Sequence, residues 1–184
     1  MTNRLPLPLA ALLLAISALL GACASGGPAS EHSYLLPAAS EPAASDRLPR
    51  VRVDVAGYLD QTGLVVETAP TSVHAARQHL WAEPLPSQLA RALRHHLAAA
   101  GAPAQGRLSV SVTRFQGTAD GNARVSGQWH YRAEPSEQEE SLERSGHFDV
   151  TRPLNQDGYP ELVTRLDAAW QAAAEQIATE LRTP

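Results

Sequence analysis

The chain has one cysteine, Cys23, which stands just after a largely apolar run that begins at Leu7. A single cysteine leaves no partner for an intramolecular disulfide, so the domain that follows must be stable by packing alone. Arg4 lies ahead of the run, and two small residues lie directly before the cysteine, as in a secretory signal with its cleavage site. The run is shorter than the ~20 apolar residues that span a bilayer. We therefore expect residues 1–22 to be a signal peptide that is removed.

The residues around the expected cleavage site favour lipid attachment. Leu20, Gly21, Ala22 and Cys23 together resemble the bacterial lipoprotein signal, whose processing leaves an acylated cysteine as the first mature residue. Cys23 is the predicted lipidation site, and three acyl chains at about 0.8 kcal/mol per buried methylene give a permanent anchor. Ala24 occupies the position where an aspartate would signal inner-membrane retention in enteric bacteria, so the resemblance implies an outer-membrane protein facing the periplasm. The alternative is an ordinary secretory signal with an incidental cysteine.

Composition divides the mature chain into a tether and one domain. Residues 23–49 are rich in Ala, Ser, Pro and Glu without an apolar period, which predicts a flexible tether after the acylated cysteine. The remaining segment, 50–184, is roughly 135 residues long, the size of one domain with one core. The formal charge is −4, and the 15 basic residues, all arginine, form no cluster. This pattern argues against a nucleic-acid partner and against electrostatic binding to acidic headgroups.

Apolar residues with a period of two predict most of the strands. In the segment 50–55, Val51, Val53 and Val55 share one face. The Asp120-Gly121 turn signal lies between two alternating segments and predicts a hairpin. The polar segment from residue 134 to residue 143 indicates an exposed loop. The expected strands after the first are 64–66, 72–80, 108–113, 125–131 and 146–151.

Two segments have the period of a helix. One carries Leu85, Leu89, Leu93 and Leu97 four residues apart, and Gly101 is expected to end it. The last helix is expected to begin near residue 160 and to continue to about residue 181. Strands followed by a helix, a hairpin and a closing helix indicate an α+β domain. We expect a mixed, largely antiparallel sheet with two main helices packed on one face.

Three side chains near these elements need a separate interpretation. Glu83 precedes the first long helix, where a carboxylate is expected to cap free N–H groups; an interface contact is the alternative. Trp129 and Trp170 lie on apolar faces of a strand and of a helix, so both are predicted core residues.

The sequence does not predict an enzyme, a metal site or a cofactor. The pairs His74/His79 and His95/His96 are not spaced to place two imidazoles on one helical face. Ser87 lacks the context of an activated nucleophile. No lysine is present, so a phosphate-binding loop of the usual kind is also absent from the sequence.

Several longer motifs resemble one family, the ABC-type transport auxiliary lipoproteins. The most specific is Trp81-Ala82-Glu83-Pro84-Leu85, and the resemblance covers nearly all of the mature chain; others are Tyr34-Leu35-Leu36-Pro37 and Gly57-Tyr58-Leu59-Asp60. The resemblance implies a part in lipid movement between the inner and outer membranes, beside an MCE-type protein that forms a tunnel. It implies a docking component, with nucleotide hydrolysis occurring in another subunit.

Some apolar and aromatic residues do not fit the core periodicity, and others lie at the start of the first long helix. We infer that these residues form a partner or oligomer interface. The candidate interface residues are Tyr58, Leu59, Trp81, Glu83, Phe115 and Gln116. A symmetric tunnel is most simply met by a symmetric collar, so a homo-oligomeric ring is one expected arrangement. The alternative function is an outer-membrane lipoprotein that regulates a cell-wall synthase or another envelope complex.

Overall fold

The computed structural model describes residues 30–41, 48–102, 105–134 and 142–182. The predicted signal peptide and Cys23 lie outside these ranges. Residues from Glu31 onward form one compact unit. Its elements are β1 (His32–Tyr34), η2 (Pro37–Ser40), β2 (Arg50–Val55), β3 (Gly63–Ala69), β4 (Ser72–Trp81), α2 (Leu85–Ala99), β5 (Arg107–Gly117), β6 (Asn122–Arg132), β7 (Glu143–Pro153) and α3 (Tyr159–Arg182).

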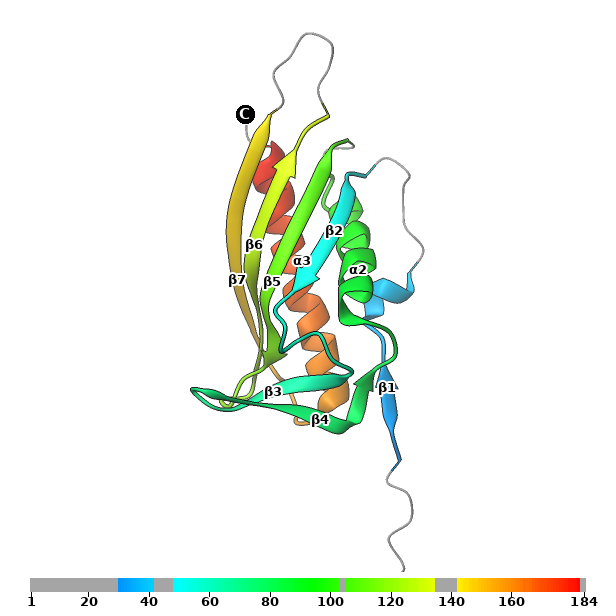
Figure 1. Cartoon of the computed structure of the whole chain (residues 1–184), viewed down its shortest axis with the longest axis vertical. Helices are drawn as coiled ribbons and strands as arrows, with labels where there is room; N and C mark the ends of the chain where they lie inside the picture. The colour runs from blue at the N-terminus through cyan, green and yellow to red at the C-terminus, as the bar shows by residue number, and fades with distance from the viewer. Residues whose placement is uncertain (1–29, 42–47, 103–104, 135–141, 183–184) are drawn as a thin grey trace, which may run out of the picture. The chain divides into compact units, whose positions relative to one another are not determined.

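The seven strands form a mixed sheet in the order β1-β4-β3-β5-β6-β7, with β2 paired to β5 outside this path. The β3–β4, β5–β6 and β6–β7 pairs are antiparallel, whereas β1–β4 and β2–β5 are parallel. A single parallel pair, Val66 with Gly117, joins β3 to β5. Figure 1 shows the consequence: β3 and β4 lie across the lower end of the long β2-β5-β6-β7 sheet. The α+β prediction is confirmed.

Both predicted helices pack on the same face of the sheet (Figure 1). The leucine stripe of α2 is buried, with Leu89, Leu93 and Leu97 at 0% exposure. Gly101 ends α2 as predicted, with a φ of +67°. The N–H of Gly101 donates to the Ala98 carbonyl and the N–H of Ala102 to the Leu97 carbonyl, which is the Schellman arrangement.

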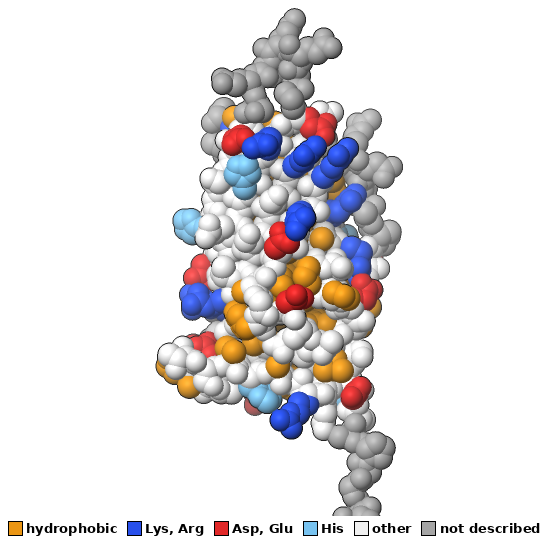
Figure 2. Space-filling view, in the orientation of Figure 1, with side chains coloured by type: hydrophobic (Ala, Val, Ile, Leu, Met, Phe, Trp, Pro, Cys, Tyr) orange, Lys and Arg blue, Asp and Glu red, His pale blue; other side chains and the backbone are white. Residues whose placement is uncertain are grey.

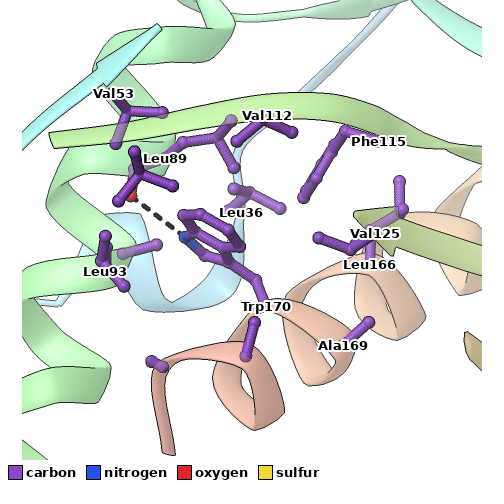
Figure 3. Packing of buried hydrophobic residues seen from close by; sticks show 14 of the residues in the cluster. Leu36, Val53, Leu89, Leu93, Val112, Phe115, Val125, Leu166, Ala169 and Trp170 are labelled. Carbon is purple, nitrogen blue, oxygen red and sulfur yellow. Dashed lines mark hydrogen bonds between the residues drawn. The ribbon is translucent and has the colours of Figure 1, made fainter. Parts of the chain in front are cut away.

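The core is centred on Trp170 of α3, whose side chain is fully buried. Its indole N–H donates to the Leu89 carbonyl of α2 over 3.1 Å. Its ring lies edge-on to Phe115 of β5 and to Phe148 of β7, with centroids 6.4 and 5.6 Å away. Figure 3 shows this ring between the two helices and the strands. The prediction that Trp129 and Trp170 are core residues is confirmed, since Trp129 is 3% exposed.

The N-terminal part of the domain differs from the prediction. The expected tether included residues 32–40, but β1 pairs with β4, and η2 packs against α2. Leu36 between them is 0% exposed, and its N–H donates to the buried Gln88 side chain over 2.9 Å. The Ala38 N–H lies 3.4 Å from an Asp167 carboxylate oxygen of α3. The folded domain therefore begins near residue 31, because this segment closes the core between the helices.

We expect Leu36→Ala to lower the free energy of unfolding by about 2–5 kcal/mol, because it empties a fully buried site. The neighbouring Leu35 is 41% exposed and is a matched control. Leu35→Ala should change stability by no more than about 0.5 kcal/mol. Urea denaturation of a Cys23→Ser form measures both values. Equal effects of the two substitutions would show that the segment is not part of the core.

Candidate functional site

The loop between β2 and β3 is attached to a bulge in β5. The register of β5 with β6 shifts between Val112 and Arg114, so Thr113 is the extra residue. The Tyr58 hydroxyl of the loop donates to the Thr113 carbonyl over 2.9 Å and lies 2.7 Å from the Gln116 side-chain oxygen. Burial raises the pKa of the Tyr58 phenol above its ordinary value. Tyr58 therefore fixes the loop where the strand ladder is interrupted.

The same bulge explains why periodicity failed for Phe115 and Gln116. Before the bulge, Val110 and Val112 point into the core; after it, Phe115 does, so the inward positions change from even to odd numbers. An extra residue moves every later side chain to the opposite face. Phe115 is 1% exposed and Gln116 is 4% exposed. Their irregular spacing reflects this change of face.

Two further candidates, Leu59 and Trp81, are also core residues. Leu59 is 1% exposed and Trp81 is 6% exposed. The Trp81 ring lies 6.0 Å from the Phe115 ring, between centroids. Leu59, Trp81 and Phe115 therefore support the loop from beneath and are not available for contact with a partner in this conformation. Tyr58 and Glu83 remain as exposed candidates.

Glu83 lies beside the start of α2 without capping it. Pro84 is the N-cap residue, and the helix start has no side-chain cap hydrogen bond. The Glu83 carboxylate instead pairs with Arg91 over 2.7 Å, and both side chains are 43% exposed. The capping prediction is wrong, because Glu83 lies one position too early and its side chain extends along the helix. The Gln88 amide donates to the Glu83 carbonyl and orders this backbone.

The loop 56–62 separates two open grooves. One groove, of about 320 Å³, is lined by residues 60–62 and 81–85. The other, of about 330 Å³, is lined by Tyr58, the 67–73 hairpin, Thr113, Arg114 and Gln116. Hydrophobic side chains gather on this lower half of the face, whereas arginines predominate on the upper half (Figure 2). The groove before α2 is the more apolar of the two, whereas polar side chains predominate in the other.

The histidines do not assemble a metal-binding group within the described parts of the chain. His79 stacks on Tyr159 at 3.9 Å between ring centroids, and His96 lies 3.6 Å from Asp167 in the core. None of the helices in the described ranges has the length and hydropathy of a membrane span.

The sequence matches a family model, "ABC-type transport auxiliary lipoprotein component", over residues 34–178. The chain belongs to this family. It is 33% identical to the intermembrane transport lipoprotein PqiC of Escherichia coli K12, over 92% of this chain and 96% of that protein. The Shigella flexneri protein of the same name matches equally.

Two solved structures have the same fold. A crystal structure of an uncharacterised protein aligns with a TM-score of 0.67 and 30% identity, covering 83% of this chain and 99% of the other. A Xanthomonas campestris protein aligns with a TM-score of 0.57 and 16% identity, covering 83% of this chain and 93% of its own. The second likeness concerns the fold alone.

We expect Tyr58→Phe to lower stability by about 1 kcal/mol, because the Thr113 carbonyl loses its hydroxyl donor. Tyr159→Phe is the control, since the Tyr159 hydroxyl makes no hydrogen bond within the described ranges. The control should change stability by less than about 0.5 kcal/mol. Thermal denaturation compares the two variants. An unchanged melting temperature for Tyr58→Phe would contradict the anchoring role.

The contacts of Glu83 and Gln88 predict unequal costs on removal. Glu83→Ala removes an exposed ion pair and should cost less than about 1 kcal/mol. Gln88→Ala should cost about 1–3 kcal/mol, because the Leu36 N–H loses its acceptor inside the core. Chemical denaturation measures both. A larger cost for Glu83→Ala would mean that its carboxylate stabilises the helix start after all.

Proposed function

We propose that this protein is a non-catalytic docking component of an intermembrane lipid transport complex. In this proposal it is anchored through Cys23 to the outer membrane, faces the periplasm and contacts an MCE-type tunnel protein. The observation that carries the proposal is the match to PqiC along nearly the full length of both chains. That relative is named an intermembrane transport lipoprotein, which agrees with the lipoprotein signal before Cys23.

The contacts of the polar side chains support docking in preference to catalysis. The Tyr58 hydroxyl is engaged with a backbone carbonyl and with Gln116, and the Glu83 carboxylate is engaged with Arg91. Groups held in this way stiffen a surface. A rigid apolar patch with a polar rim is the usual anatomy of a protein interface.

The groove between loop 56–62 and the start of α2, lined by residues 60–62 and 81–85, is the proposed contact surface. Tyr58 combines an apolar ring with a polar tip and is 37% exposed, as is common for residues that dominate binding energy. Glu83 and Arg91 lie at the edge of the patch and would favour one orientation of the partner. Several copies arranged as a ring would present this surface symmetrically to a tunnel.

The revised start of the domain bears on the alternative, regulation of a cell-wall complex. The expected tether of residues 23–49 was compatible with either function. Only residues 24–31 separate Cys23 from β1. Eight residues span at most about 29 Å when fully extended. A domain held this close to its membrane suits docking at that membrane.

Photocrosslinking in intact cells tests the docking proposal. A benzophenone amino acid at Gln61 or Ala82, both exposed at the groove before α2, should capture an MCE-type protein. The same probe at Gln171, exposed on α3, should capture much less. If neither groove position captures such a partner, and gene deletion leaves detergent sensitivity unchanged in strains lacking parallel lipid transport systems, the regulatory role is favoured.

The anchor is tested separately. Cys23→Ser should release a folded domain from the outer-membrane fraction, because no acyl chain then holds it. Immunoblotting of soluble and membrane fractions measures the release. A variant that still sediments wholly with outer membranes would disprove lipid anchoring.

A further inference from the structure

We propose that the outer surface of β4 faces the lipid headgroups of the membrane that carries the Cys23 anchor, and that the opposite end of the domain points away from it. This orientation rests on the proposed lipidation of Cys23. In this proposal a lipid surface lies against β4. Three observations support it: the chain enters the fold beside β4, the residues between Cys23 and β1 are few, and β4 exposes apolar and basic side chains.

The chain enters the domain beside β4. His32, the first residue of β1, pairs with His79 of β4, and their rings stack at 5.3 Å between centroids. Figure 1 shows β3 and β4 across the lower end of the domain, with β1 extending past them. The residues that connect to the anchor therefore leave the domain at its β4 end.

Helix α3 extends from the β4 end of the domain to the opposite end, so its length gives the distance between the two ends. Its first residue, Tyr159, stacks on His79, and Glu180 near its last turn accepts a hydrogen bond from Arg144 at the start of β7. Twenty-four residues of α-helix extend about 36 Å. An inverted domain would place β1 this far from the membrane, beyond the reach of about 29 Å of residues 24–31. The short connection therefore excludes the inverted orientation.

The composition of β4 suits contact with headgroup phosphates. The strand Ser72–Trp81 contains no Asp or Glu, although the chain has a formal charge of −4. Val73 is 47% exposed, and His74 and Arg77 are also exposed. Glu67 of β3 pairs in register with Val73, and Glu31 directly precedes β1. One arginine selects an orientation, whereas the acyl chains provide the affinity.

Lipid crosslinking on the full lipidated protein tests the orientation. The protein is reconstituted in vesicles of phosphatidylethanolamine and phosphatidylglycerol with a benzophenone amino acid at Val73 or at Leu142. The two positions are matched, because Val73 is 47% and Leu142 is 51% exposed. We expect lipid adducts, detected by mass spectrometry, to be several times more abundant at Val73. Equal yields, or a higher yield at Leu142, would overturn the orientation.

A longer connection between Cys23 and β1 tests whether the short connection orients the domain. Insertion of 20 flexible residues after Ser30 should bring the adduct ratio of Val73 to Leu142 close to one, because a connection of 28 residues can reach roughly 100 Å and either end of the domain can then face the membrane. An unchanged ratio would show that the short connection does not orient the domain. Failure of the anchor itself is distinguishable, because the protein would then not float with the vesicles at all.

Discussion

The contact of Trp170 with three elements organises the whole domain. Its indole N–H bonds the backbone of α2, while its ring fills the space between Phe115 of β5 and Phe148 of β7. A buried indole needs a hydrogen-bond acceptor, and the Leu89 carbonyl provides it at the point where the helices meet. Both helices are thereby held on one face of the sheet. The other face carries polar side chains and remains open.

The bulge at Thr113 determines where the long sheet ends and the lower strands begin. Up to Val112, β5 pairs with β2; beyond the bulge, Gly117 of β5 pairs with Val66 of β3. The released carbonyl of Thr113 is taken up by Tyr58, so the loop after β2 is ordered by the irregularity itself. Both grooves border this loop. A local break in the ladder thus creates the candidate surface.

These two features also explain how far prediction from the sequence succeeded. Helices and strands with long, regular periods, such as α2 and β6, were predicted because their apolar faces are visible locally. The β1–η2 segment was missed, since a three-residue strand has no period and Leu36 is held by Gln88, 52 positions later. Phe115 and Gln116 were assigned to an interface because the bulge, which no local pattern announces, moved the alternation by one residue.

The missed segment has the largest consequence for function. A docking protein on a long tether would search for its partner in many orientations, and each contact would carry the entropic cost of selecting one. Burial of Leu36 makes residues 32–40 of the expected tether part of the folded domain and leaves eight residues between β1 and the proposed lipidation site, Cys23. Part of the entropic cost of orienting the domain is then met during folding, before any partner binds. In the proposed docking role, the packing that completes the core would therefore also orient the groove before a partner binds.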